Sequence, residues 1–344
     1  MEVLELRITS RGPVCIGSGA TYQKQEYLFD SRTAQVSILD RDAFIALLVR
    51  KGLEDAYEQF ILGGGRLDRF LRERCRLRET EIDAITRYTV SAADALNGEG
   101  PLREIAAFQR DPQGRAYLPG SGVKGALRTA FLVSRILRES NGRGEPFSEE
   151  RYLNQLRYNE KRRQDAVNDL FRGVRIADSA PIPDEAMILA GKVDVSPDGS
   201  AHSVNLCREC LRPGETVRLV LTLDQSLLRG RITADLLRQS ITDFSDYYRE
   251  TYLRHFTLPA QDSIENYRDC LMLGAGTGFF AKTVTYPYYG EPAALKKTAQ
   301  LLQRRFRQGK HEQDEMQGIS PHTLKYTRYN GRLYPFGVCG VELR

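Results

Sequence analysis

The 344-residue sequence lacks tryptophan and has no long apolar run. Methionine and histidine are rare, with four residues of each. A helix that crosses a bilayer needs about 20 consecutive apolar residues, so we expect no membrane segment. Residues 1–5 carry neither a basic stretch nor a long apolar one, so we expect no secretory signal. The six cysteines lie far apart except for one pair, which does not indicate a disulfide framework. These features favour a reducing, cytoplasmic location.

Composition and length indicate a folded chain of more than one domain. Hydrophobic residues make up 41% of the sequence, which supports a real core, and the length predicts about two domains. We expect the boundary at residues 181–183, giving an N-terminal domain of residues 1–183 and a C-terminal domain of residues 184–344. The excess of Lys and Arg is concentrated in residues 121–175 and 291–328. Such segments are typical of solvated helix faces and also of nucleic-acid-binding surfaces.

Alternation of apolar and polar residues predicts strands, and apolar residues three and four apart predict helices. The expected strands run over residues 2–9, 26–29, 36–39, 102–108, 115–118, 170–176, 187–195, 202–206, 216–223, 323–329 and 336–343. Helices are expected after Asp40, from Ser121 to about Glu139, and over residues 237–248 and 295–306. Residues 50–104, rich in charge, are expected to form a helical insertion. This pattern predicts an α+β fold of two ferredoxin-like (RRM-like) domains in tandem, with helical and hairpin insertions.

The stretch from Tyr117 to Leu132 carries the strongest functional signal. Gly120 follows a proline that breaks the preceding strand, and we expect Ser121 to cap a helix start. Lys124 and Arg128 lie four residues apart, so they project from one face of that helix. Free N–H groups, the helix dipole and two cations suit a phosphate. The alternative is an ordinary turn followed by solvated cations. The spacing does not fit a nucleotide-hydrolysing P-loop, because Gly120 and Lys124 are too close.

Two further glycine loops stand out, at Gly17-Ser18-Gly19 and at residues 274–278. The second is not a dinucleotide fingerprint, because Phe279 occupies the position of the required third glycine. Small residues let a ligand backbone approach closely. Gly276, Phe279 and Lys282 would then offer backbone, a stacking ring and a cation to a nucleic acid, while at least one of the two adjacent phenylalanines is expected in the core.

Signals for catalysis and for metal binding are weak. Cys207 and Cys210 have metal-ligand spacing, but zinc needs about four ligands and no second pair follows. The four histidines are scattered along the chain, with no base close to an activating partner by spacing. Asp178 is either a metal ligand or a turn former, and we favour the turn. We therefore expect no cofactor, no metal and no catalytic residue.

The motif from Leu118 to Arg128, Leu-Pro-Gly-Ser-Gly-Val-Lys-Gly-Ala-Leu-Arg, resembles the signature of the RAMP superfamily of CRISPR-associated proteins. The order of further motifs narrows the resemblance to the family of fifth subunits of the type III-A CRISPR effector, the Csm complex. These motifs are found at residues 16–19, 174–179, 211–214, 276–279, 282–283 and 320–325. The lysine motif alone indicates the superfamily, whereas the ordered set covers nearly the whole chain.

The resemblance implies a guide RNA (crRNA) binding subunit that caps the backbone of the complex on the side of the guide's 3′ end. It implies contact with the neighbouring RAMP backbone subunit and support of crRNA maturation, without catalysis. A small helical subunit and host nucleases are further candidate partners, and no membrane is implied. The RNA contacts of the family carry over to Gly17, Ser18, Gly19, Gly120, Ser121, Lys124, Arg128, Gly276, Phe279 and Lys282.

Two hypotheses therefore remain for the chain. The first is a scaffold that binds RNA without cutting it, with the helix start at Gly120 and the two other glycine loops forming one continuous track for a sugar–phosphate strand. The second is an endoribonuclease that itself trims the guide RNA. An enzyme acting on a small nucleotide is a weaker third possibility, since it depends on the glycine loops alone.

Overall fold

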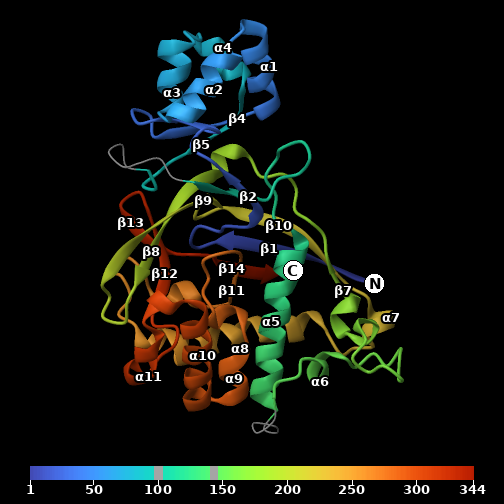
Figure 1. The fold of residues 1–344 in the computed structure, drawn as a ribbon. Coiled ribbons are helices and arrows are strands. Elements are labelled where there is room, and N and C mark those ends of the chain that lie inside the picture. The colour runs from blue at the N-terminus through green and yellow to red at the C-terminus, as the bar shows by residue number, and fades with distance from the viewer. Residues whose placement is uncertain (97–103, 140–145) are drawn as a thin grey trace.

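The structure is a computed structural model, and it describes residues 1–96, 104–139 and 146–344. Two sheets are stacked one above the other, with most helices below them and a separate helical unit above them (Figure 1). The α+β class predicted from the sequence is confirmed. Within the described residues, no helix has the length and apolar character needed to cross a membrane.

The smaller sheet is built around the first strand. Its five antiparallel strands, in spatial order, are β11 (Cys270–Met272), β14 (Val338–Leu343), β1 (Glu2–Ser10), β10 (Thr216–Leu223) and β7 (Val174–Ile176). Leu6 and Ile8 of β1 are each 1% exposed, as the alternation of that strand requires. Helices α5 (Gly120–Arg138) and α8 (Ala234–Tyr247) pack together beneath this sheet through apolar faces (Figure 1). The main core lies between the helices and the sheet.

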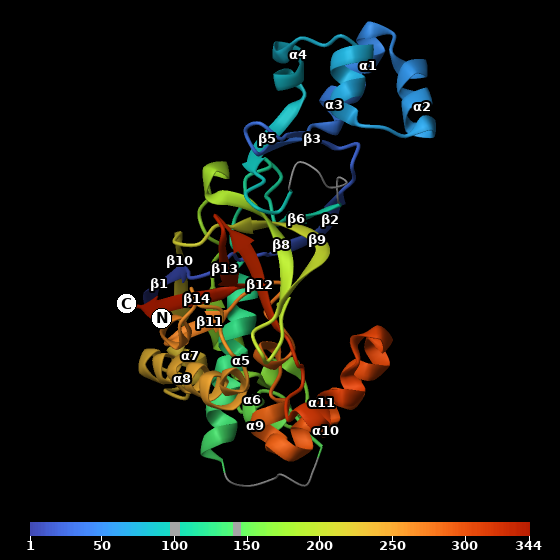
Figure 2. The same cartoon turned by 90° about the vertical axis from the view of Figure 1, so that its left-hand side faces the viewer.

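The larger sheet curls over the smaller one. Its main strands, in spatial order, are β2 (Gly17–Tyr22), β6 (Ile105–Phe108), β9 (Ala201–Leu211), β8 (Met187–Val195), β5 (Thr86–Ser91), β4 (Gln35–Leu39) and β3 (Tyr27–Asp30). Strand β12 (Leu324–Tyr329) pairs with both β8 and β13 (Arg332–Pro335). The long β8–β9 hairpin reaches down beside the C-terminal helices (Figure 2). A register shift after Gly191 bends this hairpin.

A helical unit projects from the end of the larger sheet (Figure 2). It contains α1 (Arg41–Lys51), α2 (Glu54–Gly63), α3 (Leu67–Arg69), a π-helical turn (Phe70–Arg74) and α4 (Glu79–Ala84). Asp40 caps α1 by accepting from the Ala43 N–H, as predicted. The unit has its own apolar core, centred on stacked Phe60 and Phe70. The insertion was expected over residues 50–104, but its helices end at Ala84 because Tyr88 and Val90 alternate inward as strand β5.

The remaining α-helices are α6 (Glu150–Leu153), α7 (Gln225–Leu228), α9 (Thr285–Tyr289), α10 (Glu291–Arg305) and α11 (Asp314–Gln317). Most predicted strands are present within a residue or two of their expected bounds. The strand expected over residues 170–176 is half wrong, because Leu170–Gly173 form a 3-10 turn before β7. The helix expected from Ser121 to about Glu139 ends at Arg138, as predicted to within a residue. The start of the strand expected at residue 102 lies outside the described residues.

Strands from both sides of residue 183 share the smaller sheet. Strand β1 lies between β10 and β14, and β7 lies against β10. The parts before and after the expected boundary are thus joined through main-chain hydrogen bonds. The division at residue 183 into two ferredoxin-like domains stays a prediction.

Gly120, the first residue of α5, lies where a side chain has no space. A Cβ atom there would be 2.2 Å from the carbonyl oxygen of Ile176 in β7, whereas a Cβ at Gly125 in the same helix would have nothing within 4 Å. We predict that Gly120→Ala lowers the free energy of unfolding by about 1–3 kcal/mol through overpacking. Gly125→Ala, the matched control, should raise it by up to about 1 kcal/mol through helix propensity. Urea denaturation measures both; equal effects of the two variants would contradict this packing.

Candidate nucleic-acid interface

The start of α5 is capped by an acidic residue that follows β7. The Gly120 N–H donates to Asp178 Oδ1 at 2.8 Å, while Ser121 is exposed and makes no capping hydrogen bond. The predicted Ser121 cap is therefore wrong, and Asp178 is a helix cap rather than a turn former. The carboxylate satisfies one free N–H and complements the helix dipole. Part of the anion-binding capacity expected at this helix start is thus already used within the chain.

Lys124 and Arg128 have different surroundings. Arg128 pairs with Glu149 through Nε and with Asp169 through Nη1, both at 2.6 Å, and lies over the Phe171 ring. Lys124 is half-buried and, within the described ranges, makes no hydrogen bond or ion pair of its own. Desolvation lowers the pKa of Lys124, and the charges of Arg128 and Arg175 add to this against the opposing effect of Asp169. Lys124 is therefore available to a phosphate, whereas Arg128 is engaged in holding neighbouring segments.

The segment that leads into Gly17-Ser18-Gly19 is joined to the loop at residues 274–278 by a main-chain hydrogen bond. The Ala275 N–H donates to the Cys15 carbonyl at 2.7 Å, immediately before the exposed Gly17-Ser18-Gly19 run. Gly274 has φ +78°, and a Cβ there would lie 2.0 Å from that same carbonyl oxygen. Only glycine fits this position without moving backbone. Gly17, Ser18 and Gly19 form the start of strand β2, so the glycine loop expected there is wrong. The segment that leads into them lies beside the loop at residues 274–278.

The second loop presents its functional groups at the surface. Phe280 is buried in a cluster of tyrosines, stacked 4.7 Å from Tyr252, whereas Phe279 is half-exposed. One of the two phenylalanines is thus core, as expected, and the other is accessible. Lys282 is exposed, and partial desolvation together with the nearby charge of Arg208 lowers its pKa.

The α5 start does not lie beside these loops. Gly120 packs against β7, and the loop at residues 274–278 follows β11; these strands form opposite edges of the five-stranded sheet. Four strand spacings of about 4.8 Å separate such edges by roughly 19 Å. The residues expected to form one continuous track therefore lie in two places. Gly120, Ser121, Lys124 and Arg128 lie beside β7, whereas Gly276, Phe279 and Lys282 follow β11. Gly17, Ser18 and Gly19 begin β2, an edge strand of the larger sheet, and the segment before them contacts the loop after β11.

A basic groove of about 870 Å³ opens beside the second place. Gly276, Gly278 and Phe279 form part of the lining of this basic groove. It is lined by six cationic side chains against one carboxylate, Asp194. The cations are Lys192, Arg208, Arg304, Arg305, Arg307 and Lys325. Such an imbalance in a concave surface favours a polyanion.

Arg208 has a buried nitrogen that no acceptor in the described part of the chain reaches. Its Nη1 is buried without a hydrogen-bond partner, and its guanidinium lies 6.0 Å from the Phe336 ring centre. Gly276, with φ +89°, lets the loop approach: a Cβ there would be 3.1 Å from this Nη1. A buried charged donor without a partner is costly, and an anion in the groove offers it one.

The lysines in the groove share their one acidic neighbour. Lys192 Nζ lies 3.1 Å from Asp194 Oδ2, and Lys325 Nζ lies 3.0 Å from Asp194 Oδ1. Burial lowers the pKa of Lys325, and Asp194 opposes that shift. The trio keeps a net positive charge when both lysines are protonated.

Sequence reasoning missed part of this groove. In the sequence Arg208 lies between Cys207 and Cys210, and Lys192 lies in a strand without a basic run around it. Neither position therefore indicated a cationic surface. Arg304, Arg305 and Arg307 belong to the basic segment at 291–328, which was the available signal. The helix expected over residues 295–306 ends at Arg305, and the Phe306 ring that follows it is 52% exposed at the groove.

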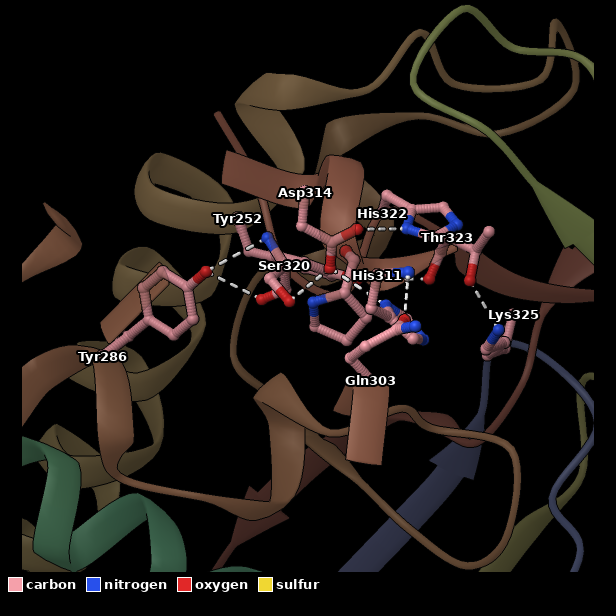
Figure 3. A network of polar contacts seen from close by, with 10 residues as sticks. Tyr252, Tyr286, Gln303, His311, Asp314, Ser320, His322, Thr323 and Lys325 are labelled. Atoms are coloured by element: carbon pink, nitrogen blue, oxygen red, sulfur yellow. Dashed lines mark hydrogen bonds and ion pairs between the residues drawn. The ribbon is translucent and has the colours of Figure 1, made fainter. Parts of the chain in front are cut away.

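Three further polar residues meet at the groove wall. His311 and His322 both contact the buried Asp314 (Figure 3), although their spacing in the sequence gave no sign of it. Among the described residues no disulfide is formed: the six cysteine side chains are buried, and Cys207 and Cys210 belong to different hydrophobic clusters.

The fold and motifs match known proteins. The family model of the RAMP superfamily matches residues 7–325. Similar curated proteins include the "CRISPR system Cms protein Csm5" of Mycobacterium tuberculosis (strain CDC 1551 / Oshkosh), 26% identical with 100% of this chain and 98% of the relative covered. That of Enterococcus italicus is 25% identical, with the same coverage. That of Streptococcus thermophilus is 26% identical over 89% of this chain and 84% of the relative.

Two solved structures have a similar fold. One is a chain in the cryo-EM structure of a Csm–crRNA–target RNA ternary complex of a type III-A CRISPR-Cas system. It has a TM-score of 0.66 and 18% identity and covers 98% of this chain and 100% of that chain. The other is the crystal structure of T. onnurineus Csm5, with a TM-score of 0.62, 17% identity, and coverage of 98% and 99%.

The pairing of Arg128 predicts a role in stability. We expect Arg128→Ala to lower the free energy of unfolding by about 1–2 kcal/mol, because two partly buried carboxylates lose their charged donor. Arg175→Ala is the control, since its pair with Asp224 involves an arginine side chain that is 60% exposed and should change stability by less than about 0.5 kcal/mol. Chemical denaturation measures the free energy of unfolding of both variants. If the Arg128 variant is as stable as the control, the two carboxylate pairs do not stabilise the fold.

Proposed function

Because this chain belongs to the RAMP superfamily, we propose that it is an RNA-binding subunit of a type III-A CRISPR effector complex, the Csm complex. The names of its curated relatives and its likeness to a chain of the solved Csm–crRNA–target RNA complex support this assignment. The observation that carries it is the basic groove, with six cations, one carboxylate and an accessible Phe279 from the glycine loop at residues 274–278.

The ligand we propose is the crRNA. Unmatched cations along a groove suit consecutive phosphates, and their attraction for them does not depend on sequence. Phe279 and Phe306 offer rings on which bases can stack. Lys124, at the other sheet edge, is proposed as a separate phosphate contact.

Its place in the assembly follows the family pattern. We propose that the chain caps the backbone on the crRNA 3′ side, contacts the neighbouring RAMP backbone subunit and supports crRNA maturation in the cytoplasm. A small helical subunit and host nucleases are proposed further partners. The arrangement as two ferredoxin-like domains belongs to the same proposal and is supported by the likeness of the whole fold.

The groove predicts how RNA affinity depends on salt. Removing two phosphate contacts from single-stranded RNA should make the slope of log K against log salt shallower by about 1.4. We expect this of Arg304→Ala/Arg307→Ala, measured by fluorescence anisotropy with a labelled guide-length RNA. Arg229→Ala/Arg231→Ala removes the same charge from another groove of the chain and should leave the slope nearly unchanged. Equal losses in both double variants would indicate non-specific attraction and contradict the proposed site.

The proposed role is binding without cleavage. Purified protein should therefore shift a guide-length RNA in a native gel and leave it intact in a denaturing gel, with Mg²⁺, with Mn²⁺ and with EDTA. Cleavage that co-purifies with the wild-type chain and disappears in a groove variant would support the endoribonuclease alternative instead.

A further inference from the structure

A buried carboxylate joins two histidines beside the groove. Asp314 is fully buried; its Oδ2 lies 2.9 Å from His311 Nδ1 and its Oδ1 lies 2.5 Å from His322 Nδ1 (Figure 3). Ser320 Oγ donates to Asp314 Oδ2 at 2.5 Å. One possible ligand atom from each of the residues His311, Asp314 and His322 lies within 4.8 Å of the others.

Surrounding side chains hold this cluster in place. The Tyr286 hydroxyl donates to the Ser320 carbonyl at 2.7 Å, and the Tyr252 hydroxyl donates to the Pro321 carbonyl at 3.0 Å. Gln303 at the end of α10 accepts from the His311 main-chain N–H at 2.9 Å. Three separate elements therefore position the segments that carry the two histidines. Such outer contacts are what orient ligating side chains in metal sites.

The segment that carries the cluster has little apolar anchoring. In residues 306–323 the apolar side chains Phe306 and Met316 are 52% and 86% exposed, whereas Ile319 is buried. The buried polar side chains are those of His311, Asp314 and Ser320. The polar cluster is thus a main attachment of this segment, which contains only short helical turns, to the body of the protein.

We propose that His311, Asp314 and His322 bind one divalent transition-metal ion of the zinc class at the wall of the basic groove. Two imidazoles and a carboxylate are ligands that Zn²⁺ accepts, with a water molecule completing four-coordination. Ligands about 2.1 Å from a tetrahedral ion lie roughly 3.4 Å apart, so the present N···O contacts need to open by less than about 1 Å. The ion would tie the segment at His311 to the segment at His322.

The exchange of hydrogen bonds for metal bonds is chemically balanced. Without metal, each histidine donates its Nδ1–H to one oxygen of Asp314, because a carboxylate only accepts hydrogen bonds. With metal, each imidazole carries its proton on Nε2 and directs the Nδ1 lone pair to the ion, so neutral histidines release no proton. Ser320 keeps its hydrogen bond to Asp314 and orients the ligating carboxylate.

The neighbouring arginines oppose the binding of a cation at this site. Arg304, Arg305 and Arg307 line the same groove and repel a cation. The negative charge of Asp314 is therefore needed to retain the ion. Neutralising this one carboxylate should weaken binding more than replacing either histidine.

Zn²⁺ titration of the EDTA-treated, dialysed full chain tests the proposal by isothermal calorimetry. We expect about one equivalent bound and a concentration-dependent rise in the thermal midpoint, because an ion that binds the folded state stabilises it. Co²⁺ serves as a spectroscopic probe: tetrahedral nitrogen and oxygen ligation gives visible d–d bands without the thiolate charge-transfer band that cysteine ligation would give.

Asp314→Asn and His322→Gln should each weaken Zn²⁺ binding by at least about tenfold, while His202→Gln, in the exposed part of β9, should not change it. Circular dichroism checks that each variant is folded, and the wild-type Co²⁺ spectrum answers the question even if a variant is not. A wild-type chain that binds no Zn²⁺, binding that survives in both variants, or a thiolate spectrum would overturn the proposal. RNA binding is measured separately, so failure of either proposal leaves the other testable.

Discussion

The structure depends on one close main-chain approach, between the Cys15 carbonyl and the Ala275 N–H. It can form because Gly274 has no Cβ where that carbonyl lies. Strand β1 belongs to the centre of the smaller sheet, while β11 is at its edge. This contact therefore places the loop that leaves the first strand beside the loop that leaves β11, and it gives the basic groove one of its walls.

The groove concentrates charge that the free chain does not neutralise. Lys192, Lys325 and Asp194 form a partly compensated trio, whereas Arg208 keeps a buried nitrogen without a partner. Repulsion among such cations disfavours the empty groove, and a phosphate chain relieves it. The α5 start is different, because Asp178 and the two partners of Arg128 already supply negative charge within the chain. The same motif thus combines a structural arginine with an available lysine.

Much of the fold was predictable from local pattern, but the joining of its parts was not. Alternation identified β1 and β10, and Asp40 was correctly expected to cap α1. Ser121 was wrongly chosen as a cap because Asp178, 58 residues from Gly120 in sequence, reaches the helix start. Residue type revealed the loops around Gly276 and Phe279, whereas strand order decided that they lie far from Lys124. His311 and His322 meet through Asp314, in a segment whose helical turns are too short to give a periodic pattern.

The central claim is that RNA lies in the basic groove. Photo-crosslinking of a guide-length RNA containing 4-thiouridine to the intact chain, followed by peptide mass spectrometry, tests it most directly. RNA held in the groove should crosslink to peptides that contain Phe279 and residues 304–308. Crosslinks confined to residues 154–163 and 229–231, with none in the groove, would contradict it.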